Sequence, residues 1–214
     1  NLANNHQLPG AILQFEDATT RVRETLITYA LNNVAGIANR GEAYAWVNNW
    51  FRTIPPQQGL SGEEDYTMAW LEDVIREART RHGCKWIILD PWNELEHIWD
   101  KGKNEASYIN DAVRRLKRIA RAYQIILMIV AHPTKEGGKV KEIEDLDLYM
   151  VAGGAAWNNK ADHGIVVHRP DKSKPQAYIK VSKSKNQQLY GLPGTTRDQY
   201  DIMAAKIRYI GMGK

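Results

Sequence analysis

The amino-acid sequence predicts an α/β fold: a mostly parallel central sheet flanked by helices, with antiparallel strands at one edge. Three observations predict it. Two continuous apolar runs, Lys85–Asp90 and Gln124–Ala131, are typical of parallel strands that are buried on both faces. Amphipathic helical segments alternate with the apolar runs through the first 131 residues. Beyond them, segments that alternate in polarity follow one another without helices, which indicates antiparallel strands.

In the first half of the chain, each element is predicted from its own periodicity and from the residues that end it. Apolar residues recur at helical spacing after Asp17, and Asp17 or Thr19 is a plausible N-cap. Pro55-Pro56 ends one strand, and His82-Gly83 closes a helix. The predicted elements are a strand at Ala11–Phe15, a helix at Asp17–Asn33, a strand at Val47–Ile54, a helix at Tyr66–Arg81 and a strand at Lys85–Asp90.

The second half begins with one long amphipathic helix and then changes in character. Its later apolar segments are short and alternate with polar residues, as strands nearer an edge do. The predicted elements are a helix at Glu105–Tyr123, a strand at Gln124–Ala131, a short helix at Ala152–Lys160 and strands at Gly164–His168, Gln176–Ser182 and Ala205–Ile210.

Length and composition indicate one globular domain over residues 1–214, long enough to bury a sizeable core. No apolar run is long enough to cross a bilayer, so we expect no membrane partner. The one cysteine, Cys84, excludes a disulfide within the chain, which favours a cytoplasmic protein. The sequence starts at Asn1 without a methionine, and we expect a domain truncated at its N-terminus.

The formal net charge is +4 and the isoelectric point is about 9.0, a mild preference for polyanionic partners that is also ordinary for a soluble protein. The positions of the lysines are more informative than the total. One group lies in a glycine-containing stretch and a second group follows it: Lys135, Lys139 and Lys141, then Lys172, Lys174, Lys180, Lys183 and Lys185.

Three polar residues follow predicted strands and are expected at one edge of the sheet, where open parallel sheets bind ligands. Asp90 ends an apolar strand in the Walker B pattern, whose carboxylate helps to hold Mg²⁺, although an Asp here also serves as a cap or turn residue. His132 and Glu16 end two other strands. A lone histidine is more often structural, but three polar side chains at three strand ends suit nucleotide hydrolysis.

The order and spacing of several short motifs resemble the RecA-like P-loop NTPase core of DnaB-type replicative DNA helicases, closest to phage primase–helicases and the mitochondrial helicase Twinkle. The resemblance runs from about Ala11 to Gly194, nearly the whole chain. The motifs are Gln14-Phe-Glu16, Ile87-Ile-Leu-Asp90, Ile129-Val-Ala-His132, Gly153-Gly-Ala-Ala-Trp-Asn-Asn-Lys-Ala-Asp162, His168-Arg169 and Val181-Ser-Lys183-Ser-Lys185 with Gly191.

This resemblance implies an ATP- and Mg²⁺-dependent motor on single-stranded DNA that works as a homo-oligomeric ring, with a primase fused or associated. Glu16 would activate water, Asp90 would be the Walker B acid, and His132 would sense the nucleotide. The implied DNA-binding residues are Lys135, Lys139, Lys141, Gly153, Gly154, Trp157 and Asn158. For the lysines, the alternative is a solvated loop, and most of the tryptophans are better explained by packing.

The resemblance also implies residues that reach the nucleotide of a neighbouring subunit: Arg169, Lys183 and Lys185. Lys185 stands where the family has an arginine finger, and lysine lacks the planar fork of arginine. No G-x-x-x-x-G-K-[ST] occurs in these 214 residues, so the cradle for the β- and γ-phosphates is missing from them. We therefore expect this chain by itself to be inactive. The alternatives are a non-catalytic nucleic-acid-binding or scaffold module and a regulatory ATPase without unwinding activity.

Overall fold

The computed structural model describes residues 2–54, 66–95, 104–140, 142–171, 173–201, 203 and 206–212. The chain divides into two compact units, the first formed by Asn1–Lys101 with Arg115–His132 and the second by Gly102–Arg114 with Pro133–Lys214. Each unit contains one four-stranded sheet. The single domain that the sequence predicts stays a prediction. Among the described residues, no helix combines the length and the apolar character that crossing a membrane requires.

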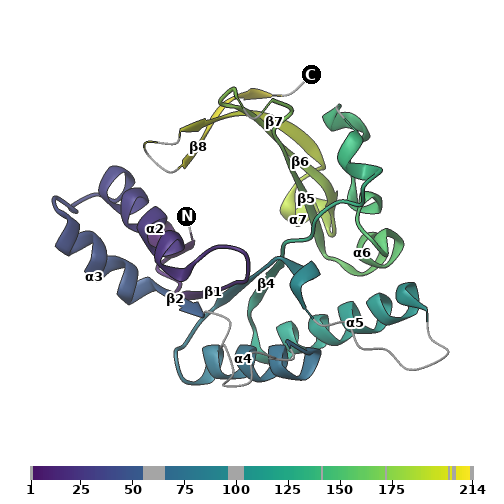
Figure 1. The fold of residues 1–214 in the computed structure, drawn as a ribbon, viewed down its shortest axis with the longest axis horizontal. Coiled ribbons are helices and arrows are strands. Elements are labelled where there is room, and N and C mark those ends of the chain that lie inside the picture. Colours follow the sequence, from purple (N-terminus) through teal and green to yellow (C-terminus); the bar gives the residue numbers. More distant parts are fainter. Residues whose placement is uncertain are drawn as a thin grey trace. The chain divides into compact units, whose positions relative to one another are not determined.

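The first unit is a parallel sheet with helices on both faces. Its strand order is β2-β1-β3-β4, and each neighbouring pair is parallel. Figure 1 shows α2 and α3 on one side of these strands and α4 and α5 on the other. Its elements are α1 (Leu2–His6), β1 (Gly10–Gln14), α2 (Thr19–Asn33), α3 (Arg40–Trp50), β2 (Phe51–Ile54), α4 (Met68–Thr80), β3 (Trp86–Asp90), η1 (Trp92–Glu94), α5 (Glu105–Tyr123, which the second unit shares) and β4 (Ile126–Ile129).

The alternation of side chains along these strands supplies two apolar layers. On one face, Ile12 and Trp86 belong to a buried cluster with Ile27 and Ala30 of α2 and Val47 of α3. The residues in between are also buried and face the other way, where α4 and α5 contribute their own buried side chains. The strand residues of this layer are Ala11, Leu13, Ile87 and Leu89, and the helix residues are Leu71, Ile75, Ala78 and Leu116.

The strand predicted at Val47–Ile54 is wrong in its first half, because α3 continues through Trp50 and β2 starts at Phe51. Asn39 caps α3 by accepting a hydrogen bond from the Glu42 amide at 3.0 Å. Ala43 and Val47, one helical turn apart, are both fully buried. The N-cap predicted for α2 also differs: Ala18 occupies that position and provides no side-chain hydrogen bond.

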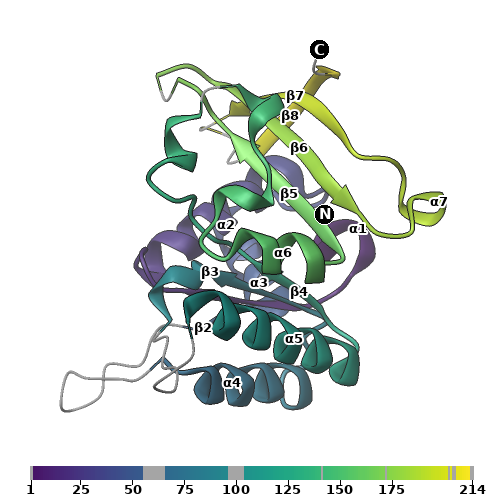
Figure 2. The ribbon, with the colours of Figure 1, turned by 90° about the vertical axis from the view of Figure 1, so that its right-hand side faces the viewer.

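The second unit contains an antiparallel sheet in the order β5-β6-β7-β8 (Figure 2). The mostly parallel sheet with flanking helices is confirmed, and the antiparallel strands form a sheet of their own. The polar strand β7 was not predicted, since it has no apolar alternation. The elements are η2 (Gly137–Lys139), η3 (Ile143–Asp145), η4 (Leu148–Met150), α6 (Gly154–Lys160), β5 (His163–His168), β6 (Gln176–Ser184), α7 (Gln187–Tyr190), β7 (Gly194–Asp201) and β8 (Lys206–Met212).

Candidate functional site

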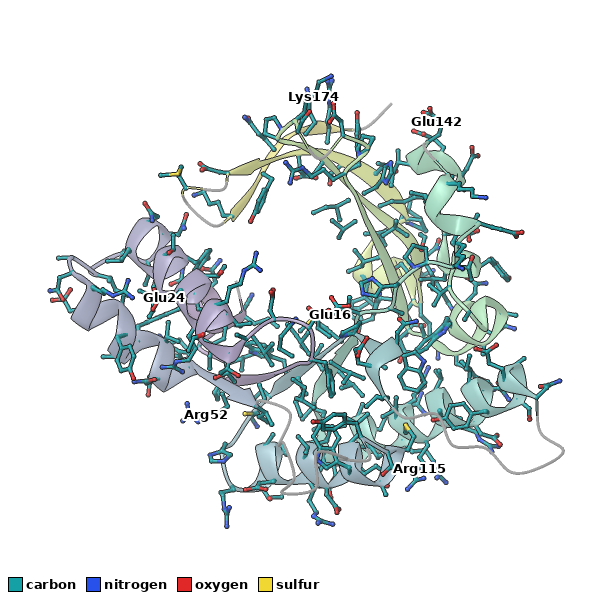
Figure 3. The ribbon with its side chains drawn as sticks, viewed as in Figure 1. Glu16, Glu24, Arg52, Arg115, Glu142 and Lys174 are labelled. Carbon is teal, nitrogen blue, oxygen red and sulfur yellow. The ribbon has the colours of Figure 1, made fainter. Side chains whose placement is uncertain are left out.

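Three polar side chains meet at the carboxyl edge of the sheet in the first unit. Asp90 is the last residue of β3, and Glu16 and His132 lie just beyond the ends of the neighbouring strands β1 and β4. Glu16 Oε1 lies 3.1 Å from His132 Nε2, and both side chains are half exposed. Figure 3 labels Glu16 where the chain leaves β1. The structure thus brings together the three residues that the sequence places at strand ends.

Asp90 is coupled electrostatically to both of these side chains. Burial raises the pKa of the Asp90 carboxyl above its ordinary value, and the negative charge of Glu16 raises it further. His132 acts in the opposite direction on this pKa, and Asp17 adds a smaller increase. Burial and the Glu16 charge therefore both disfavour the ionised form of Asp90.

A divalent cation fits this carboxylate. Mg²⁺ is usually held in proteins by one or two carboxylates together with substrate phosphates, rather than by a cage of protein ligands. Within the described ranges, no group of three or more His, Cys, Asp or Glu side chains is arranged to hold a metal ion. Asp90 could contribute one oxygen ligand, and a cation there would favour the ionised carboxylate that burial and Glu16 disfavour.

A contact that the sequence does not predict holds the backbone of His132 in place. The His132 amide donates to Asn93 Oδ1 at 3.0 Å, and the Trp92 amide donates to the Val130 carbonyl at 2.7 Å. Trp92 is itself 3% exposed. The short η1 segment after Asp90 thus ties the end of β3 to the end of β4. The only signal in the sequence is that Asn93 lies three residues after Asp90.

The second unit carries the segment with the first group of lysines. Lys135 and Lys139 are exposed, and neither has an ion-pair partner within the described part of the chain. Lys141 lies outside the described residues. Two free cations on one short segment are consistent with contacts to a phosphate backbone.

The glycines and the tryptophan of α6 have packing roles in this unit. Gly153 has φ +69°, and a Cβ there would lie 2.5 Å from Ile109 Cδ1. A Cβ on Gly154 would lie 2.4 Å from the Tyr149 Cα. Trp157 is 8% exposed and its indole N–H donates to the Ala152 carbonyl at 3.0 Å. The burial of this ring agrees with the packing role considered for the tryptophans, and a DNA contact by Trp157 stays a prediction.

Asn158 also has partners within the second unit. The side-chain amide of Asn158 donates to the Tyr149 hydroxyl at 2.9 Å, and the backbone carbonyl of Asn158 accepts from the Lys183 ammonium. Asn158 is therefore bonded to the segment that precedes α6 and to β6.

The residues predicted to reach a neighbouring subunit each contact the second unit of their own chain. Arg169 Nε donates to the Lys174 carbonyl at 2.9 Å, and its guanidinium lies 5.6 Å from the centroid of the Tyr200 ring. Lys185 Nζ is 3.5 Å from an oxygen of Asp162. Lys183 is bonded to the Asn158 carbonyl, so each of the three side chains already has a partner within its own chain.

Comparison with known proteins identifies the family and the fold. The profile of the AAA domain family matches residues 2–138, more than half of the chain. The Twinkle homolog protein of Arabidopsis thaliana, described as chloroplastic/mitochondrial, is 28% identical over 138 residues. That match covers 62% of this chain and 18% of the relative, so this chain matches less than a fifth of the length of that protein.

Two solved structures share the fold. One, described as an ATPase domain, superposes with a TM-score of 0.71 at 13% identity, covering 98% of this chain and 76% of that domain. A DnaB-like replicative helicase, described together with its interactions with primase, gives a TM-score of 0.72 at 13% identity, covering 96% of this chain and 51% of the helicase. The chain therefore belongs to the AAA domain family, and its fold is the RecA-like core of DnaB- and Twinkle-type helicases.

Proposed function

We propose that this chain is the core of an ATP-dependent replicative DNA helicase, in which ATP hydrolysis drives movement along single-stranded DNA. The observation that carries the proposal is the 3.1 Å contact between Glu16 and His132 beside Asp90, at the carboxyl edge of a parallel sheet. Similarity to the Twinkle homolog and to the DnaB-like helicase supports a role in replication.

In this proposal the three side chains have different tasks. Glu16, half exposed and close to a histidine, accepts the proton of the attacking water. Asp90 holds Mg²⁺, which when bound offsets the negative charge on the phosphates. His132 is bonded to Glu16 through its ring and to Asn93 through its backbone amide, so a shift of Glu16 is transmitted to the loop that follows β4.

The partners follow from the second unit. Lys135, Lys139 and Lys141 contact the phosphate backbone of single-stranded DNA without reading its sequence. Arg169, Lys183 and Lys185 reach the nucleotide of the next subunit in a homo-oligomeric ring, and a primase is a further partner. Cys84, the one thiol of the chain, is buried and free, which fits the reducing cytoplasm that we propose as its location.

The catalytic part of the proposal is tested in a fusion that supplies a phosphate-binding loop. A strand and G-x-x-x-x-G-K-[ST] loop from a similar helicase domain, joined ahead of Asn1, should give ATP hydrolysis that single-stranded DNA stimulates. Glu16→Gln in that fusion should lower kcat by about 100-fold or more while KM changes little, since it removes a general base. Glu24→Gln, in an exposed ion pair with Arg40, is the matched control.

The nucleic-acid part is tested by binding a fluorescent thymidine homopolymer to the 214-residue chain. Affinity should fall steeply with salt and be lost when Lys135, Lys139 and Lys141 are replaced by alanine. If the chain is a scaffold module, it would bind DNA, but the fusion with the added phosphate-binding loop would not hydrolyse ATP. A regulatory ATPase would hydrolyse ATP without responding to single strands, and either result would contradict the proposed motor.

A further inference from the structure

The ammonium of Lys180, on β6, is bonded to three backbone carbonyls of the segment 143–146, which follows the residues Lys135 and Lys139 in the chain. Lys180 Nζ lies 3.2 Å from the Ile143 oxygen, 2.5 Å from the Glu144 oxygen and 2.8 Å from the Leu146 oxygen. A lysine ammonium has three donors and no acceptor, so these three bonds use its whole capacity. Bonds between a charged donor and carbonyls are stronger than those between neutral groups.

The loop that this ammonium holds is closed at its base. The Thr134 amide donates to the Met150 carbonyl at 2.7 Å, and Pro133 forms an isolated bridge with Val151. Between these points the chain passes through Lys135 and Lys139 and returns through η3.

The returning segment is packed as well as bonded. Ile143 is 5% exposed and Leu146 is 8% exposed, whereas Glu142, Glu144 and Asp145 are exposed. Burial of two apolar side chains stabilises this segment in proportion to the buried area, but because the hydrophobic effect is non-directional it does not fix the orientation of the carbonyls. The Lys180 ammonium supplies that orientation, because its three bonds require three carbonyls to converge on one point.

We propose that Lys180 is a positioning residue for DNA binding: it fixes the returning segment of the 134–150 loop so that Lys135 and Lys139 are held in a constant geometry toward a phosphate backbone. The inference rests on the proposed DNA-binding function of that loop. All three donors of Lys180 are used within its own unit, so we infer that Lys180 acts through the loop and not by a phosphate contact of its own.

The first experiment measures the loop itself. Lys180→Met keeps the aliphatic stem and removes the ammonium. Amide hydrogen exchange, followed by mass spectrometry on peptides that span 142–151, should become at least about tenfold faster. The control is Lys174→Met, which removes the same charge from the turn between β5 and β6, where Figure 3 labels Lys174. Lys174 Nζ lies 3.4 Å from an oxygen of Asp171. Unchanged exchange in Lys180→Met would overturn the inference.

The second experiment asks whether Lys180 acts through the loop. With the thymidine homopolymer, Lys180→Met should weaken binding by about tenfold and reduce the slope of log K against log salt by more than about 1, since more than one phosphate contact is lost. Lys174→Met should change affinity by less than about twofold. Added to Lys135→Ala with Lys139→Ala, the Lys180→Met change should have no further effect.

Each failure has its own signature. A slope change of about 1 that persists in the loop-neutralised background, with exchange unchanged, would make Lys180 a direct phosphate contact and overturn the inference. Binding that is lost with Lys135→Ala and Lys139→Ala but kept in Lys180→Met would overturn the inference and leave the proposed function intact. If exchange is faster in Lys180→Met but the wild-type chain binds no single-stranded DNA, the result would contradict the proposed function.

Discussion

At the scale of single residues, Asp90 shows the conflict between stability and chemistry most clearly. It ends a buried strand, and burial together with the nearby Glu16 carboxylate raises its pKa. A group whose pKa is higher in the folded than in the unfolded state makes stability fall as pH rises from the unfolded value to the folded value. Charged Asp90 is therefore tolerated by the fold rather than stabilising it, as expected of a residue kept for a ligand.

Asp90→Asn should accordingly stabilise the metal-free chain at about pH 7, by less than about 1 kcal/mol because the carboxyl is only partly buried. The gain should shrink as the pH falls through the folded pKa and disappear below about pH 3, where the aspartate is mostly neutral in both states. Urea unfolding at both pH values measures the difference. A variant that is less stable than the wild type at neutral pH would show that the Asp90 charge is compensated in the fold.

Cys84 should be unreactive in the folded chain. It is fully buried, and burial raises the pKa of its thiol, so both access and the thiolate fraction are reduced. We expect labelling by a water-soluble aromatic disulfide to be about 100-fold slower in buffer than at the same pH in about 8 M urea, which unfolds most domains. Rapid labelling of one thiol per chain in buffer would contradict the buried position.

At the scale of elements, the pairing of β1 with β3 depends on a close approach. Gly10 pairs with Trp86, and a Cβ at Gly10 would lie 2.0 Å from two atoms of the indole ring. The Trp86 indole N–H also donates to the Leu8 carbonyl at 2.8 Å, which limits how far the ring can move. Glycine is therefore required at this position for space.

Gly10→Ala should lower the free energy of unfolding by about 1–3 kcal/mol or more, the range for overpacking a core. Chemical denaturation followed by tryptophan fluorescence measures it. Gly138→Ala is the control, since nothing lies within 4 Å of a Cβ there, and it should change stability by less than about 0.5 kcal/mol. Equal stabilities for the two variants would mean that Trp86 can move away from Gly10.

At the scale of the whole molecule, the absence of a phosphate-binding loop from these 214 residues governs nucleotide affinity. Glycine-rich loops bind phosphates through converging backbone amides at a helix N-terminus. The three side chains at the sheet edge offer two carboxylates and a histidine, which do not replace that cradle. We expect ATP to bind more weakly than about 1 mM and to show no turnover, by calorimetry and phosphate release. Micromolar binding with hydrolysis would contradict this account.

The sequence by itself determined the parallel sheet and its candidate site. Continuous apolar runs place β1, β3 and β4, and a polar residue after each run must lie at the carboxyl edge if the strands are parallel. Periodicity gives the strand ends, and buried apolar runs separated by helices favour parallel strands, so the sequence predicted that Glu16, Asp90 and His132 lie at one edge.

Only the tertiary structure decided the features that depend on contacts between distant segments. Lys180 is bonded to the 143–146 segment and Asn93 to His132, and nothing in the local sequence of either residue indicates its partner. The burial of Trp157 likewise depends on the segments that pack around it. The polar strand β7 is a strand because its backbone pairs with β6 and β8, and not because its side chains alternate. Hydrogen-bond partners and burial arise from the folded arrangement, so they cannot be read from the composition of one segment.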